Sequence, residues 1–161
     1  MLPGSGLSAS PVRSLFTPRR ADLAVKWRFF QSLPGGCDPE AERIYRWHIE
    51  RRVRHRWNAG LPMDGWKRST DDYVTAAEHL FLSMLTRGFD LSCPVPVDPD
   101  GHILGGAHRI ACALALEIDE IPVLECLERV WAPAWDFEWF IREGMGDEDL
   151  TRLVRDFEAC R

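Results

Sequence analysis

The sequence predicts an α+β domain in which short strands pack among longer helices. One observation is a strongly capped helix from Ser69 to Gly88. Another is a pair of short extended segments, Val95–Val97 and Ile121–Leu124, which are separated by a glycine turn and an alanine-rich helix. Because 161 residues suffice for one hydrophobic core, residues 1–161 are expected to form a single domain.

The composition is that of an ordinary globular protein, with 45% hydrophobic residues and a net charge of -5. This acidic balance disfavours a nucleic-acid partner, because proteins that bind phosphate backbones are usually basic. Five cysteines without a C-x-x-C pair or zinc-type spacing indicate neither a disulfide framework nor a protein metal centre, and they favour a cytoplasmic location. No apolar run reaches the roughly 18 residues that cross a bilayer, so no membrane partner is expected.

The N-terminal part is expected to be a loose arm followed by helices. Residues 1–20 contain several prolines and glycines and are predicted to lack regular structure. Residues 21–65 are predicted to hold two helices, one from Ala21 to the break at Pro34 and one that begins at Asp38, a good capping residue. The second helix carries the basic run Arg51–Arg56, which is either a solvated helix face or an anion-binding surface.

The central helix has the signature of a capping box. Ser69 is the N-cap, Asp72 follows three residues later, and Gly88 is the predicted stop. After the extended segment Val95–Val97, Asp98–Gly101 predicts a hairpin turn that leads into a short strand. Asp98, Asp100 and His102 are therefore interpreted as turn residues.

Residues 128–161 are predicted to form two C-terminal helices that are split at Gly144–Gly146. The first of these helices is aromatic, with Trp135, Trp139 and Phe140. Such residues either complete the core or line a ligand pocket, and packing is the commoner role.

Two local features point to chemistry. Of the 20 basic residues only Lys26 and Lys67 are lysines, and lysine, unlike arginine, can give up its proton. The second feature is the turn Gly105–Arg109 between a strand and a helix, where glycines allow close approach of a ligand and the helix start favours an anion. Glycine turns of this kind also occur for packing reasons alone.

The stretch VDPDGHILGGAHRIACALALEIDEIPVLE, from Val97 to Glu125, resembles the nucleotide-binding part of the ParB/sulfiredoxin superfamily. In that fold a strand, a G-x-x-R turn, an alanine-rich helix and an "IPV" strand follow one another in this order. The resemblance covers residues 66–127 and implies a small mixed sheet with surrounding helices. Residues 1–65 and 128–161 lie outside it.

Departures from the family pattern distinguish among its branches. Sulfiredoxins have a catalytic cysteine where this chain has Ala107, and Cys112 lies more than one helical turn further on, so sulfinic acid repair is not expected. ParB proteins continue into a helix-turn-helix region, which the acidic, tryptophan-rich residues 128–161 do not resemble. The free-amino-acid kinases of this fold are closest, because their DGHHR turn matches Gly106, His108 and Arg109 and differs at Gly105 and Ala107.

The resemblance implies a set of candidate site residues. The residues expected to bind nucleotide phosphate are Lys67, Ser69, Gly105, Gly106, Ala107, His108 and Arg109. The expected catalytic residues are Asp71, Asp72 and His108, although Asp72 also has the competing capping role. Asp64 and Glu50 are further carboxylates that could serve as base or metal ligand.

These features together predict a phosphotransferase that uses ATP or ADP, with CTP not excluded, and Mg²⁺. The acceptor would be a hydroxyl of a small metabolite of the amino acid or sugar alcohol class. The alternative is a non-catalytic nucleotide-binding switch or a protein-interaction module of the same fold. A third hypothesis, DNA binding through Arg51–Arg56, predicts an affinity that falls steeply with salt.

Overall fold

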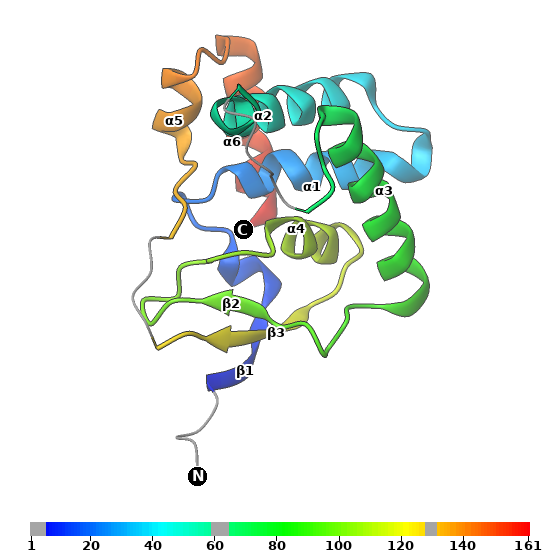
Figure 1. The fold of residues 1–161 in the computed structure, drawn as a ribbon, viewed down its shortest axis with the longest axis vertical. Helices are drawn as coiled ribbons and strands as arrows, with labels where there is room; N and C mark the ends of the chain where they lie inside the picture. The colour runs from blue at the N-terminus through cyan, green and yellow to red at the C-terminus, as the bar shows by residue number, and fades with distance from the viewer. Residues whose placement is uncertain (1–5, 59–64, 128–131) are drawn as a thin grey trace.

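The computed structural model describes residues 6–58, 65–127 and 132–161, and it has an α+β fold (Figure 1). The strands are β1 (Gly6–Pro11), β2 (Val95–Val97) and β3 (Glu120–Glu125). The α-helices are α1 (Asp22–Ser32), α2 (Pro39–Asn58), α3 (Thr70–Arg87), α4 (Ala107–Ala115), α5 (Phe137–Arg142) and α6 (Asp147–Cys160). Short 3-10 turns at Val12–Leu15 and Leu33–Gly35 flank α1. Figure 1 shows the sheet at one end of the molecule and α2, α5 and α6 towards the other.

The three strands form one mixed sheet in the order β1-β3-β2. β2 runs parallel to β3, whereas β1 runs antiparallel to β3, with Gly6 opposite Glu125 and Pro11 opposite Glu120. The prediction of a loose arm over residues 1–20 is therefore wrong for Gly6–Pro11. This segment has no run of β-branched residues, so its sequence does not indicate a strand. It becomes a strand because it pairs with β3, and local propensity does not predict such pairing.

One face of the sheet is buried under α4. Val95 and Val97 of β2 and Ile121 and Val123 of β3 lie inside, and α4 covers them with its own buried face. The predicted turn is confirmed: the Gly101 N–H donates to the Asp98 carbonyl, and one antiparallel bridge joins Val97 to Ile103. The β2-α4-β3 crossover thus places the first turn of α4 beside the helical layer.

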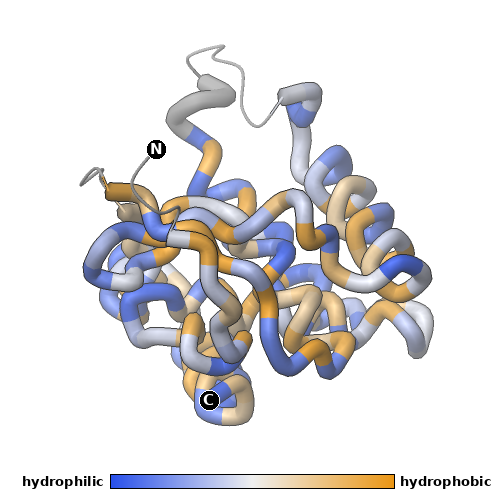
Figure 2. Tube along the Cα trace, turned by 90° about the horizontal axis from the view of Figure 1, so that it is seen from below, coloured by the Kyte–Doolittle hydropathy of each residue, from blue (hydrophilic) through white to orange (hydrophobic). Residues whose placement is uncertain are grey.

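The predicted helices are confirmed, including their caps. Ser69 accepts from the Asp72 N–H, and the Asp72 carboxylate accepts from the Ser69 N–H, so the capping box is present. The break before α2 and the split before α6 also fall where the glycines and prolines predict them. Figure 2 shows hydrophobic and hydrophilic residues interleaved along the helices, as expected where each helix buries one face in a shared core.

α1 is the helix around which the others pack. Phe29 and Phe30 are fully buried, and the ring of Phe29 stacks on Tyr45 of α2 with centroids 4.4 Å apart. Phe30 faces Phe81 of α3 at 6.3 Å. No helix in the described ranges is long and apolar enough to cross a membrane.

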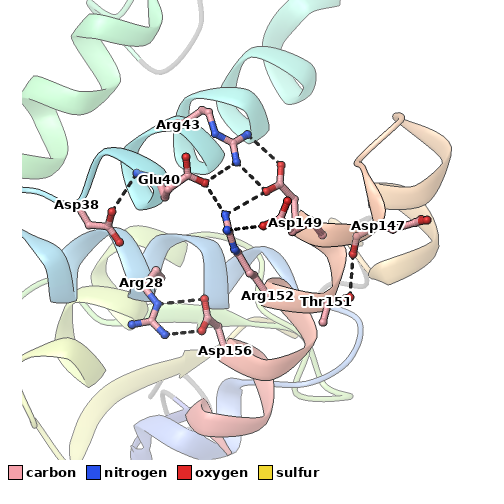
Figure 3. A network of polar contacts seen from close by, with 10 residues as sticks. Arg28, Asp38, Glu40, Arg43, Asp147, Asp149, Thr151, Arg152 and Asp156 are labelled. Atoms are coloured by element: carbon pink, nitrogen blue, oxygen red, sulfur yellow. Dashed lines mark hydrogen bonds and ion pairs between the residues drawn. The ribbon is translucent and has the colours of Figure 1, made fainter.

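Ion pairs attach α6 to α1 and α2 (Figure 3). Arg28 of α1 donates through Nε and Nη2 to both carboxylate oxygens of Asp156, at 3.1 and 2.5 Å. Further out, Arg43 and Arg152 share Glu40 and Asp149 in a more exposed network. The inner pair is the better shielded from solvent, because the Asp156 side chain is only 9% exposed.

The two layers of this network are expected to differ in energy. Asp156→Ala leaves Arg28 without its forked partner and should lower the free energy of unfolding by about 1–3 kcal/mol. Arg152→Ala removes exposed contacts and should cost less than about 1 kcal/mol. Urea unfolding of both variants measures the difference, and equal losses would contradict it.

Candidate functional site

A group of charged residues is buried at the start of α1. Asp22 accepts from Nε and Nη2 of Arg20 at 2.8 and 3.0 Å, and from the Lys26 ammonium at 2.6 Å. Arg20, Asp22 and Lys26 are 2%, 0% and 1% exposed. Two cations therefore share one carboxylate in the interior of the protein.

His48 of α2 extends this group. Its Nε2 lies 3.2 Å from the Lys26 ammonium. Because an ammonium only donates, Nε2 is the acceptor and the ring proton is on Nδ1. Nδ1 is buried and has no hydrogen-bond partner among the described residues. The His48 ring packs against the rings of Trp139 and Phe140, with centroids 5.4 Å apart in each pair. These two aromatic residues, for which packing was the commoner predicted role, therefore lie beside the site.

The surroundings shift the pKa values of these groups. Burial by itself would raise the pKa of Asp22, but Arg20 and Lys26 outweigh it and hold that pKa well below its usual range. Burial lowers the pKa of Lys26 to about 8, against the opposing effect of Asp22. Burial and the neighbouring Lys26 also hold the pKa of His48 well below its usual range, so this imidazole is neutral at neutral pH.

His108 reaches the same region from the first turn of α4. Its Nε2 lies 2.8 Å from the Tyr45 hydroxyl, and its ring packs edge-on against Phe30 and Tyr45 at 6.5 and 5.8 Å. Burial lowers the pKa of His108 well below its usual range, and Lys26, Arg52 and Lys67 lower it further. His108 is thus a neutral imidazole surrounded by cations, and its Nδ1 has no hydrogen-bond partner among the described residues.

Lys67 and Arg52 both lie over the ring of Tyr73. The Lys67 ammonium lies 4.9 Å from the centroid of the Tyr73 ring, and the Arg52 guanidinium lies 5.4 Å from it. Arg52 also lies 5.6 Å from the Trp135 ring. The Arg52 side chain therefore points towards the interior. Of the two alternatives for the basic run Arg51–Arg56, the solvated helix face is wrong for Arg52.

We refer to these residues as the cationic cluster: Arg20, Asp22, Lys26, His48, Arg52, Lys67 and His108. Both lysines of the chain belong to it. Even without Arg52, the cations Arg20, Lys26 and Lys67 outnumber Asp22, the one carboxylate of the cluster. Such an arrangement favours the binding of an anion.

The first turn of α4 has the backbone geometry that the glycine pair predicts. Gly106 is the N-cap at φ +78°, a left-handed conformation, and it offers no side chain to the amides that follow. A Cβ at this position would lie 3.0 Å from Arg109 and 3.3 Å from Val95. Gly105 lies against Pro96, and Ala107 is the first helical residue.

The other predicted site side chains are engaged by partners of their own. Arg109 donates to the Cys93 carbonyl and lies over Phe89, so it holds the segment before β2. Ser69 and Asp72 are engaged in the capping box, and Asp71, which is exposed, pairs with Arg46 at 2.5 Å. Of the predicted set, Lys67 and His108 are the side chains that the structure brings into the cationic cluster.

The remaining carboxylates have local roles or lie outside the description. Glu50 faces Arg54 at 3.9 Å on the surface of α2, and Asp64 lies outside the described residues. Asp98 accepts from the N–H groups of Asp100 and His102 and from the His102 ring. This turn brings the three side chains within 4.8 Å of one another, and the contacts of Asp98 are those of a turn residue, as predicted.

Sequence reasoning missed three of the seven residues in the cluster. Arg20, Asp22 and His48 carried no motif, and Tyr45 was not singled out. The scarcity of lysine did mark Lys26, and its spacing of four from Asp22 within an apolar helix was the available signal for a buried ion pair. The chain was compared with models of protein families, with curated proteins and with solved structures, and none of them matches it.

The capping role of Ser69 predicts a loss of stability that does not depend on nucleotide. Ser69→Ala removes the acceptor for the Asp72 N–H and should cost about 1 kcal/mol. Thr75→Ala, an exposed change on the same helix, is the control and should stay within about 0.5 kcal/mol. Chemical denaturation without ligand gives both values, and an unchanged Ser69→Ala variant would contradict the role.

The neutral state of His48 predicts a dependence of stability on pH. An unfolded imidazole takes up a proton below about pH 6.5, whereas buried His48 does not, so the unfolded state binds more protons there. Unfolding free energy should therefore fall as pH drops from 6.5 to 5, by up to about 1.4 kcal/mol per pH unit for one such group. His48→Gln should remove its share of this slope and leave the share of His108, whose pKa is also well below its usual range. His79→Gln, on the exposed surface of α3, is the control because it removes no buried histidine.

Proposed function

We propose that this chain is a ParB/sulfiredoxin-like domain that binds a nucleotide and transfers its terminal phosphoryl group to the hydroxyl of a small metabolite. The fold supports the proposal in its coarse features, a mixed sheet with a β2-α4-β3 crossover whose glycine turn opens α4. The observation that carries it is that both lysines of the chain act electrostatically on His108, which lies in the first turn of α4 directly after the glycine pair.

Lysine is a natural partner for phosphate, because its ammonium is a compact charge with three donors. Lys67 is only partly buried and rests on the Tyr73 ring with no carboxylate partner among the described residues. The Gly106 cap leaves the first-turn amides of α4 without a side-chain acceptor. Lys67 and these amides are the phosphate-binding groups of the proposal, and Arg52 adds charge over the same ring.

Phosphoryl transfer also needs a base for the acceptor hydroxyl. Asp71 and Asp72 are held by Arg46 and by the capping box, whereas His108 is neutral and has Nδ1 available. We therefore assign the base to His108. The hydroxyl oxygen forms a bond to the terminal phosphorus, the bond from that phosphorus to the bridging oxygen breaks, and the hydroxyl proton moves to Nδ1.

Mg²⁺ fits this site only as part of the nucleotide complex. Asp22 is engaged by Arg20 and Lys26, Asp71 by Arg46, and Asp72 by backbone N–H groups. The described residues near the site thus offer no carboxylate free for a metal. Phosphate-bound Mg²⁺ commonly keeps several waters and takes few protein ligands, so no role of the ion is assigned to this chain.

The test is thermal unfolding with Mg²⁺ and ATP, ADP or CTP. A nucleotide at about 100 times its dissociation constant adds about 2.7 kcal/mol, which should raise the midpoint by about 5–10 °C. Lys67→Met should abolish the shift. Arg68→Met is the matched control, because Arg68 is exposed and bonds only to the Gly65 and Lys67 carbonyls and at its backbone to Asp72.

Turnover then separates the kinase from the switch. A kinase forms ADP, or the corresponding product, faster when an acceptor is added, and His108→Gln should lower this rate without removing the nucleotide shift. A shift without acceptor-dependent turnover would favour the non-catalytic switch. No shift with any of the three nucleotides would overturn the proposal.

A protein-interaction module is the second candidate, and one feature favours it. A groove of about 590 Å³ between α1, α3 and the end of α4 is floored by Phe30 and Phe81. Leu82 and Leu85 on its α3 side are 57% and 58% exposed, which is high for leucines that flank a groove. This candidate predicts that Leu82→Glu leaves nucleotide binding unchanged.

A further inference from the structure

The inner part of the cationic cluster has a surplus of buried charge. Arg20 and Lys26 are almost fully enclosed and share Asp22 as their carboxylate. Two of the three Lys26 hydrogens are directed at Asp22 and at His48, and no other described residue accepts the third. An unmatched cation in the interior is costly, and a bound anion offsets that cost.

This inner part is distinct from the groups that the proposed function uses for the nucleotide. Lys67 lies on Tyr73 of α3, whereas Lys26 belongs to α1 and is held by Asp22 and His48. His108 is within electrostatic reach of both lysines and was assigned the base. A group bound at Lys26 would therefore contact a different cation from the one that holds the nucleotide phosphates, and both cations act electrostatically on His108.

We propose that Lys26 is the centre of an anion-binding subsite and that the acceptor carries an acidic group, a carboxylate or a phosphate, which binds there. The part of this inference that concerns the acceptor rests on the proposed function; the subsite itself does not. Among the expected acceptor classes, this subsite favours molecules that carry an acidic group over neutral sugar alcohols.

Access to Lys26 requires side chains to move, because this residue is 1% exposed. Two partly buried members of the cluster interact electrostatically with Lys26. Arg52 lowers the pKa of Lys26, and Lys26 lowers the pKa of His108. Movement of Arg52 opens the subsite while His108 keeps its contact with the Tyr45 hydroxyl, and the anion accepts the third hydrogen of the ammonium.

The subsite has a pH signature. The charged and titratable groups around Lys26 come from three helices and the segment before α1. They are Arg20 before α1, Asp22 of α1, His48 and Arg52 of α2, and His108 of α4. Because its pKa is lowered to about 8, the ammonium is charged at pH 7 and loses its proton as the pH rises above 8. Anion affinity should therefore hold up to about pH 7.5 and fall by about tenfold per pH unit above pH 8.

The experiment uses three compounds on one carbon frame: glycerol, glycerate and glycerol 3-phosphate. Isothermal titration of the full chain should show binding of at least one of the two anions and none of glycerol at the same concentration. The anion that binds identifies whether the acidic group is a carboxylate or a phosphate. The titration is repeated at pH 7.0, 8.0 and 9.0, which requires no variant.

Lys26→Met and Lys67→Met are the paired variants. Lys26→Met should lose anion binding by at least tenfold and its pH dependence, whereas Lys67→Met should retain both. If Lys26→Met does not fold, the pH series on the natural sequence decides. Failure of both anions to bind, binding that is equal in Lys26→Met, or an affinity that does not change between pH 7.0 and 9.0 would overturn the subsite.

Failure here is distinguishable from failure of the proposed function. A nucleotide shift that depends on Lys67, together with no anion binding at Lys26, sinks the subsite and leaves the phosphotransferase. Anion binding at Lys26 without any nucleotide shift overturns the phosphotransferase and leaves the subsite. Acceptor-dependent turnover with glycerate or glycerol 3-phosphate but not glycerol supports both.

Discussion

Asp22 holds two cations inside the protein, and the packing around α1 follows from this contact. A buried carboxylate costs free energy unless it is paired and hydrogen-bonded, and Asp22 achieves this with Arg20 on one side and Lys26 on the other. The Asp22 N–H donates to the Trp135 carbonyl, so the segment before α5 lies against the start of α1. This backbone hydrogen bond, next to the ion pairs of Asp22, joins two parts of the chain that are more than a hundred residues apart.

His48 and His108 are buried among cations and are therefore unprotonated at neutral pH. Their protonation state determines whether they can accept a hydrogen bond or a proton. Neutral His48 accepts from Lys26, and neutral His108 can accept a proton from a substrate. A protonated imidazole would add to the positive charge and could not serve as a base. Burial is the main cause of the lowered pKa of His108, and the cations lower that pKa further. In the proposed function the same cations would also attract the anionic ligand.

The sequence predicts the helices well because their signals are local. Ser69, Asp72 and Gly88 mark both ends of α3, and the glycines at 105 and 106 mark the start of α4. β1 was missed because its order comes from pairing with a strand more than a hundred residues away, and Gly6–Pro11 lacks strand-forming residues. Three members of the cluster were missed for a related reason: Arg20, Asp22 and His48 are ordinary polar residues until tertiary packing brings them together.

The two residues that follow Ala107 show how one turn can serve two purposes. Successive positions on an α-helix differ by about 100° around its axis, so His108 and Arg109 cannot face the same ligand without a rearrangement. In this chain His108 faces α1 and α2, whereas Arg109 returns to the Cys93 carbonyl and covers Gly106. Arg109 therefore anchors the lead-in to β2. In the proposed function, the side-chain charge for the nucleotide phosphate must therefore come from another element, and Lys67 in the segment before α3 is the residue assigned to it.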